Sequence, residues 1–134
     1  MTEAELHALA PAPLDAALGL ALHGFEGGTA VLRLEPPELA VAGEEPEYLH
    51  GGALATCVDT AAWYAVVNGR EGEWVMVDLR CDFLRMAARV PHRVEAQCLR
   101  AGRALALADV RIAPWAQSDR AVAVGRAQLA RIDR

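Results

Sequence analysis

The sequence predicts an α+β domain in which a curved antiparallel sheet wraps around one long central helix. Two observations predict this class. The run from Gly52 to Asn68 places apolar side chains on nearly every helical face without a breaker, so this helix should be buried. Four strand-like segments follow it, and a meander of antiparallel strands after an apolar helix needs that helix as its filling. With 134 residues, 54% of them hydrophobic, a single domain over 1–134 is expected.

Breakers and periodicity give the order of the elements. Pro11 and Pro13 interrupt the first helical stretch, Gly27-Gly28 is typical of a hairpin turn, and Asn68-Gly69 is a helix stop. The expected order is a short N-terminal helix within 3–18, strands over 19–25 and 29–35, an acidic loop over 38–49, the helix over 52–68, and strands over 74–83, 92–101, 103–114 and 120–131.

The strand after the helix has the clearest pattern. Its odd-numbered residues from Val75 to Phe83 are apolar, and they alternate with Met76, Asp78, Arg80 and Asp82. This two-residue period is typical of a strand with one buried face.

Composition and charge narrow the classes of function. The net charge of −5 disfavours a nucleic-acid partner, and no apolar run approaches the ~20 residues that cross a bilayer, so no membrane partner is expected. The N-terminus carries acids rather than the basic segment of a secretory signal. Cys57, Cys81 and Cys98 lack metal-ligand spacing, which predicts reduced thiols in the cytoplasm and no metal site.

The positive charges are all arginine and lie mostly in the second half. Arg33 alone precedes position 70, whereas residues 70–134 hold twelve arginines. Guanidinium groups bind phosphate through two parallel hydrogen bonds, so this half could meet a phosphorylated ligand. Genome composition is the alternative explanation for the bias.

The motif His50-Gly51-Gly52 lies where the acidic loop becomes the buried helix. The first N–H groups of a helix have no intrahelical partner and carry the positive end of its dipole. Glycines there allow a ligand to approach the backbone, and such a place can stabilise an oxyanion. The alternative is that both glycines only permit a tight turn.

Asp59 is the one acid of the buried helix, and no positively charged residue lies three or four positions from it. An unpaired buried carboxylate is costly, and burial raises its pKa toward the range of a general base. The alternatives are that Asp59 faces solvent, or is held structurally by Thr56, Thr60 or a neighbouring strand.

Gly51 and Asp59 are eight residues apart, roughly 12 Å along a helix at ~1.5 Å per residue. One carbonyl group cannot reach both positions of the same chain. If both residues act on one substrate, they must come from different subunits. A two-fold dimer with two equivalent shared sites meets this requirement.

These features resemble the hotdog-fold acyl-CoA thioesterases, specifically the PaaI-like branch. The resemblance is carried by the His-Gly-Gly motif with Asp59 nine residues after the histidine, by the strand over 74–87 and by the turn over 100–103. It covers about residues 14–131. It implies a homodimer formed by pairing two sheets, often a dimer of dimers, that hydrolyses acyl-CoA thioesters.

The resemblance also implies roles for the motif. The Gly51 N–H would polarise the thioester carbonyl, and His50 would shape the helix start and the pocket, with Gly52 beside the substrate. Asp59 of the other subunit would activate water or attack the carbonyl itself. No cofactor is implied, because coenzyme A is part of the substrate.

Other positions concern substrate binding and departures from the family. Arg85 and Arg103 are candidates to meet the phosphates of coenzyme A. The family often has Asn six residues before the histidine, where this chain has Glu44, which could raise the pKa of Asp59 or itself act as the base. Met76 replaces a small hydroxyl residue and could narrow the pocket.

Two alternatives remain beside hydrolysis. Loss of the water-positioning groups would leave a non-catalytic acyl- or acyl-CoA-binding dimer with the same fold. Hotdog hydratase chemistry would need a histidine five residues after the acid, where this chain has Tyr64.

Overall fold

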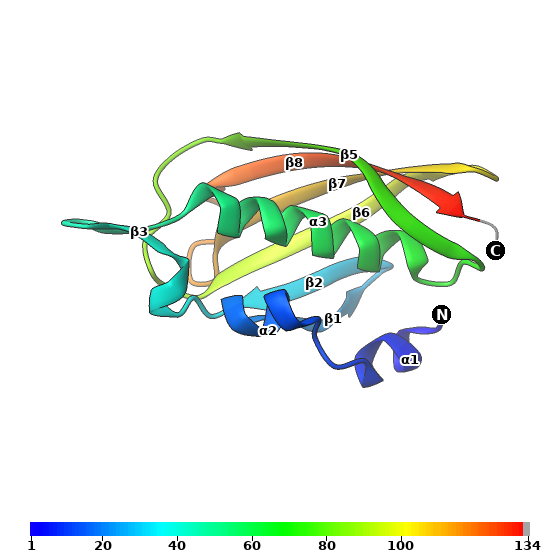
Figure 1. The fold of residues 1–134 in the computed structure, drawn as a ribbon, viewed down its shortest axis with the longest axis horizontal. Coiled ribbons are helices and arrows are strands. Elements are labelled where there is room, and N and C mark those ends of the chain that lie inside the picture. The colour runs from blue at the N-terminus through cyan, green and yellow to red at the C-terminus, as the bar shows by residue number, and fades with distance from the viewer. Residues whose placement is uncertain (133–134) are drawn as a thin grey trace.

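A six-stranded antiparallel sheet curves around one helix in the computed structural model, which describes residues 1–132 (Figure 1). The strand order is β1-β2-β6-β7-β8-β5, and β3 and β4 form a separate pair. The elements are α1 (Glu3–Ala8), α2 (Pro13–Leu18), β1 (Leu20–Glu26), β2 (Thr29–Leu34), η1 (Glu38–Ala40), β3 (Val41–Glu44), β4 (Glu47–Leu49), α3 (Gly51–Val67), β5 (Glu73–Phe83), β6 (His92–Ala101), β7 (Leu105–Pro114) and β8 (Ala123–Ile132). The predicted class, the central helix and the order of the main strands are confirmed.

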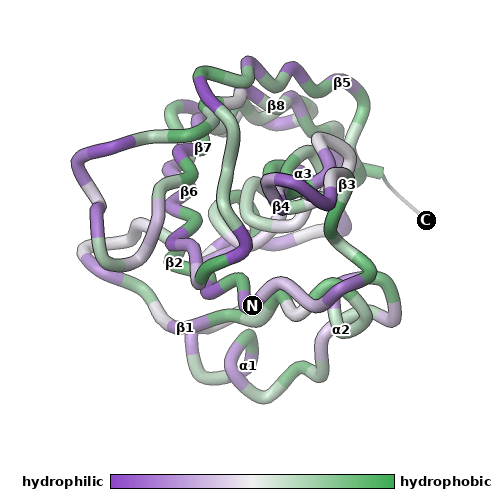
Figure 2. Tube along the Cα trace, turned by 90° about the vertical axis from the view of Figure 1, so that its left-hand side faces the viewer, coloured by the Kyte–Doolittle hydropathy of each residue, from purple (hydrophilic) through white to green (hydrophobic). Residues whose placement is uncertain are grey.

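The helix α3 fills the concave side of the sheet. In the end-on view of Figure 2 the sheet curls around α3, and α2 lies below it. Small residues on the inner face of the sheet allow this close approach: a Cβ on Gly125 of β8 would lie 2.7 Å from Cγ1 of Val58. Burial of the apolar α3 side chains, each worth about 1.5–3 kcal/mol when large, is the main stabilising term.

A side chain fixes the C-terminal end of α3. At the C-terminus, Arg70 Nη1 donates to the carbonyls of Ala65, Val66 and Asn68 at 3.0–3.3 Å. Gly69 follows with a φ of +70°, which confirms the predicted glycine stop. The helix therefore has a defined length and register relative to the sheet.

The N-terminal segment folds into two short helices that pack beside β1. Pro13 is the first residue of α2, where its missing N–H costs nothing. Gly19 ends α2 at a φ of +73°, and a Cβ there would clash with the carbonyl oxygen of Glu35. The predicted helical stretch with its break is confirmed.

The predicted acidic loop over 38–49 is wrong in detail. These residues form η1 and the β3–β4 hairpin. The ring of Tyr48 lies over Gly43, where any Cβ would clash with it, and this contact holds two short polar strands together. Such a pairing across a glycine gives no hydrophobic period, so the sequence does not show it.

A β-bulge changes the predicted pattern of β5. The register against β8 shifts between Met76 and Asp78, so Trp74 and Met76 face inward before the bulge and Leu79 and Cys81 after it. Val75 and Val77 are therefore exposed, Val77 by 54%. An added residue reverses the faces of a strand, and the continuous alternation in the sequence conceals it.

His92 is fully buried at the start of β6. Its Nδ1 donates to the Val90 carbonyl at 2.6 Å, and its Nε2 has no hydrogen-bond partner among the described residues. Burial lowers the pKa of His92, and the Val90 hydrogen bond only partly offsets this.

The state of His92 predicts a loss of stability in acid. The unfolded chain takes up a proton near pH 6.5 more readily than the folded chain, so stability should fall as the pH drops below that value. In His92→Gln, which cannot be protonated, the fall in melting temperature between pH 7 and pH 5 should be smaller. The exposed His7 is the control: if His7→Gln has the same effect, burial of His92 is not the cause.

Candidate active site

The start of α3 leaves one backbone donor free. His50 is the N-cap: its Nδ1 accepts from the Gly52 N–H at 2.8 Å, and its carbonyl accepts from Ala53 and Leu54. The Gly51 N–H makes no hydrogen bond to any of residues 1–132. This donor lies at the positive end of a 17-residue helix, where it can stabilise negative charge on an oxygen atom.

A side chain at each of the two glycines of the motif would meet a different neighbour. A Cβ on Gly52 would lie 2.9 Å from Nδ1 of His50, so glycine is needed there for the histidine to cap the helix. A Cβ on Gly51 would lie 3.2 Å from Cζ of Phe83, whose ring is 53% exposed. The assignment of Gly52 to substrate binding stays a prediction.

An apolar cavity of about 250 Å³ adjoins Gly51. Its walls come from β4, the first turn of α3, the end of β5 and the segment after it, and they include Leu54, Phe83 and Met86. Arg85 also lines the cavity, and its Nη1 donates to the carbonyl of Ala121. This cavity is thus lined by the Arg85 guanidinium, by apolar side chains and by Gly51, whose N–H makes no hydrogen bond within residues 1–132.

Asp59 lies on the one stripe of α3 that the sheet does not cover. This stripe consists of partly exposed residues, namely Ala55, Thr56, Asp59, Thr60 and Trp63. No group within residues 1–132 donates a hydrogen bond to the Asp59 carboxylate; Thr56 donates to the Gly52 carbonyl instead. Partial burial raises the pKa of Asp59, and the nearby Asp15 raises it further.

Sequence reasoning missed Asp15. This acid of α2 is only 8% exposed, and it accepts a hydrogen bond from the Thr60 hydroxyl at 2.7 Å. Its signal was available, because Asp15 lies within an apolar segment three residues before Leu18, which is buried on the same helix. Within one chain, the acid that acts on Asp59 is Asp15 rather than Glu44.

The remaining predicted residues lie apart from one another. Glu44 is exposed at the end of β3, and Met76 of β5 packs partly buried against the core. Arg103 lies in the β6–β7 turn, at the end of the sheet away from the start of α3 (Figure 1). A single chain therefore unites Gly51 with Arg85 but brings neither Glu44 nor Arg103 to Asp59.

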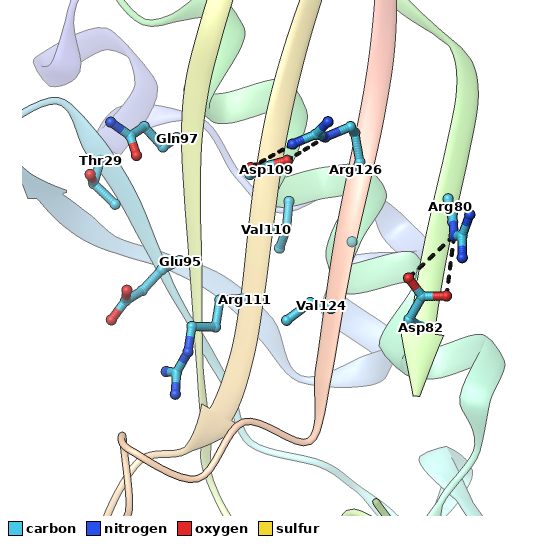
Figure 3. Close-up of a pocket in the computed structure, with 11 residues that line it drawn as sticks. Thr29, Arg80, Asp82, Glu95, Gln97, Asp109, Val110, Arg111, Val124 and Arg126 are labelled. Atoms are coloured by element: carbon cyan, nitrogen blue, oxygen red, sulfur yellow. Dashed lines mark hydrogen bonds and ion pairs between the residues drawn. The ribbon is translucent and has the colours of Figure 1, made fainter. Parts of the chain in front are cut away.

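A larger hollow of about 630 Å³ lies on the opposite face of the sheet (Figure 3). Its charged residues alternate along the strands with the side chains that face α3. Arg126 donates two hydrogen bonds of 2.7 and 3.0 Å to the Asp109 carboxylate, and Arg80 forms an ion pair with Asp82 at 3.2 Å. These exposed pairs satisfy one another on the solvent side, separated by the sheet from Asp59 and Gly51.

Residues 47–123 match the family model described as the thioesterase superfamily, and this match covers more than half of the chain. The chain belongs to the thioesterase superfamily. The match, with the relatives below, confirms the predicted hotdog fold of the PaaI-like type and the predicted enzyme class, a thioesterase.

Relatives of this thioesterase-superfamily chain include the medium/long-chain acyl-CoA thioesterase YigI of Salmonella typhimurium, 29% identical over 115 residues, with 75% of this chain and 74% of that protein covered. The Escherichia coli PaaI protein from the phenylacetic acid degradation operon has a TM-score of 0.77 at 28% identity, covering 90% of this chain and 84% of that chain. A thioesterase family protein from Silicibacter pomeroyi has a TM-score of 0.81 over 92% of this chain and 91% of its own, and at 23% identity it supports the fold alone.

Cys57 and the lengths of the helices complete the description of this thioesterase. Burial raises the pKa of Cys57 to about 12, so this thiol stays protonated and is a core residue. None of the helices within residues 1–132 combines the length and apolar character of a membrane span.

The His50 cap predicts a non-additive pair of substitutions. His50→Ala removes the capping nitrogen, and Gly52→Ala displaces the ring, so each should cost about 1 kcal/mol of stability. Because both remove the same hydrogen bond, the double variant should cost little more than either alone, as measured by urea unfolding. His50→Asn, which retains a capping group, is the control and should stay close to the parent. Fully additive losses would show that the ring and the glycine act separately.

Proposed function

We propose that this protein hydrolyses an acyl-CoA thioester to a free acid and coenzyme A, at two sites shared between the subunits of a homodimer. The observation that carries the proposal is the half-buried carboxylate of Asp59 on the open stripe of α3, which has no hydrogen-bond or ion-pair partner among residues 1–132. In a thioesterase-superfamily chain, a carboxylate kept in this costly position supports a catalytic role.

The proposed chemistry uses two groups. The Gly51 N–H donates to the thioester oxygen and stabilises the negative charge that develops there. Asp59 accepts a proton from water, whose oxygen bonds to the carbonyl carbon; the C–S bond then breaks, and coenzyme A leaves as a thiolate that takes up a proton. In the alternative, the Asp59 carboxylate attacks the carbonyl carbon, and water hydrolyses the resulting anhydride.

The need for two subunits follows from α3 itself. Gly51 and Asp59 lie roughly 12 Å apart along one continuous helix, at ~1.5 Å per residue. β5 is an edge strand of the described sheet, and it exposes Val75 and Val77. A long edge strand with exposed apolar residues favours pairing with a second copy. Such pairing supports a dimer, on which a dimer of dimers could be built.

The substrate class follows from the cavity and from the relatives. The apolar wall beside Gly51 suits an acyl or pantetheine chain, and Arg85, which lines the same cavity, is the proposed partner of a phosphate. The name of the YigI relatives makes medium- and long-chain acyl-CoA esters the first substrates to test, with an aromatic acyl-CoA beside them. The free thiols Cys57, Cys81 and Cys98 support a cytoplasmic location as part of the proposal.

Hydrolysis should depend on both groups. With a panel of acyl-CoA esters, followed by release of free thiol, Asp59→Asn should lower kcat ~10²-fold or more. Gly51→Pro should lower it by about 10²–10³-fold, because it removes the N–H. Proline is favoured at the first helical position, and the extended backbone of His50 (ψ 134°) suits a following proline.

Matched controls separate the chemistry from side effects. Gly51→Ala meets Phe83 in the same way as proline but keeps the N–H, so it should retain most of the activity of the parent. Asp119→Asn, in the exposed β7–β8 loop, should be silent. Binding of acyl-CoA without turnover by the parent would favour the non-catalytic alternative, and full activity of Asp59→Asn would remove Asp59 from the mechanism.

Shared sites predict recovery of activity on mixing. In a dimer of one Asp59→Asn and one Gly51→Pro subunit, one site combines the intact Gly51 with the intact Asp59, and the other site lacks both. Random exchange of subunits should restore about a quarter of the parent activity, since about half of the dimers are mixed and each has one working site. The measurement is thiol release after unfolding and refolding the two variants together. No recovery, despite mixed dimers shown by mass spectrometry, would place each site within one chain.

A further inference from the structure

A second buried acid lies beside the proposed catalytic carboxylate. Asp15 belongs to the six-residue helix α2, and its side chain is turned toward α3 rather than toward solvent. Its exposed fraction is 8%, close to that of the apolar Leu18 on the same helix. A buried carboxylate with no cation beside it is unfavourable unless some contact or function retains it.

One hydrogen bond anchors Asp15 to the helix that carries the site. The hydroxyl of Thr60, the residue next to Asp59, donates to Asp15 Oδ1 at 2.7 Å. This contact spans 45 residues of sequence and ties α2 to the middle of α3. The hydrogen bond therefore holds Asp15 beside the turn of α3 that carries Asp59.

The titratable groups that face α3 can be named element by element within residues 1–132. Asp15 comes from α2, Cys81 from β5, and His92 and Cys98 from the inner face of β6. α3 itself adds Tyr64 and Cys57. Asp15 is the charged group that acts on Asp59, and it also acts on Tyr64 and Cys57.

We propose that Asp15 is a positioning residue of the thioesterase site: held by the Thr60 hydroxyl, its carboxyl group lies beside the turn of α3 that carries Asp59 and adjusts how readily Asp59 takes a proton from water. The inference rests on the proposed function, in which Asp59 accepts a proton. A negative charge nearby disfavours ionisation of Asp59, so the ionised form binds a proton more tightly. A base with a pKa nearer the working pH transfers protons more effectively.

Asp15→Asn tests this role, because the amide keeps the shape of the side chain and an oxygen for the Thr60 hydroxyl. The acid limb of the profile of kcat/KM against pH should move to lower pH. On that limb the variant should be roughly twofold or more faster than the parent, although it is slower at the neutral plateau. The exposed Glu71→Gln removes one negative charge elsewhere and should leave the limb in place.

A second readout does not depend on turnover. NMR titration of the ¹³C-labelled Asp59 carboxyl should show its midpoint at lower pH in Asp15→Asn than in the parent. If Asp15 has only a structural role, Asp15→Asn should lower the melting temperature but leave the Asp59 midpoint unchanged. That result would overturn the inference. If the asparagine variant does not fold, Asp15→Ser, which can also bond Thr60, takes its place.

The two proposals fail in different ways. Loss of hydrolysis in Asp59→Asn with an unmoved Asp59 midpoint in Asp15→Asn would keep the hydrolase and remove Asp15 from its site. A moved midpoint in a parent protein that hydrolyses no acyl-CoA would overturn the function, while the interaction of the two acids would stand.

Discussion

The close packing of α3 into the concave sheet is the constraint on which the rest of the structure depends. The contact between Gly125 and Val58 brings helix and strand nearer than any side chain on β8 would allow. Hydrogen bonds from Arg70 at one end of this helix and to His50 at the other also fix its ends. Its first N–H and its one open stripe therefore have fixed positions, as a catalytic site requires.

The same packing explains why acids on this helix are informative. Most of the surface of α3 is in contact with the sheet, so a carboxylate there has few ways to be satisfied. Within residues 1–132 no side chain pairs with the Asp59 carboxylate at the rim of the core, and Asp15 is a second buried acid nearby. Two like charges at a buried interface lower stability, and their joint retention is consistent with the trade between stability and activity at functional sites.

The arrangement also separates two kinds of charge. On the outer face of the sheet, arginines and acids such as Arg126 and Asp109 pair with one another in solvent. On the inner side, the acids have no cation beside them within residues 1–132, and Arg85 lies near Gly51 instead. The larger hollow thus holds exposed ion pairs, which contribute little to stability.

The sequence by itself determined the elements whose signal is local. The breaker-free apolar run gave α3, Gly27-Gly28 gave the β1–β2 turn, and the His-Gly-Gly motif marked the start of the helix. Tertiary structure alone decided the burial of His92, the bulge that exposes Val75 and Val77, and the meeting of Asp15 with Thr60. Each of these depends on which residues from distant segments come into contact, and neither local propensity nor periodicity carries that information.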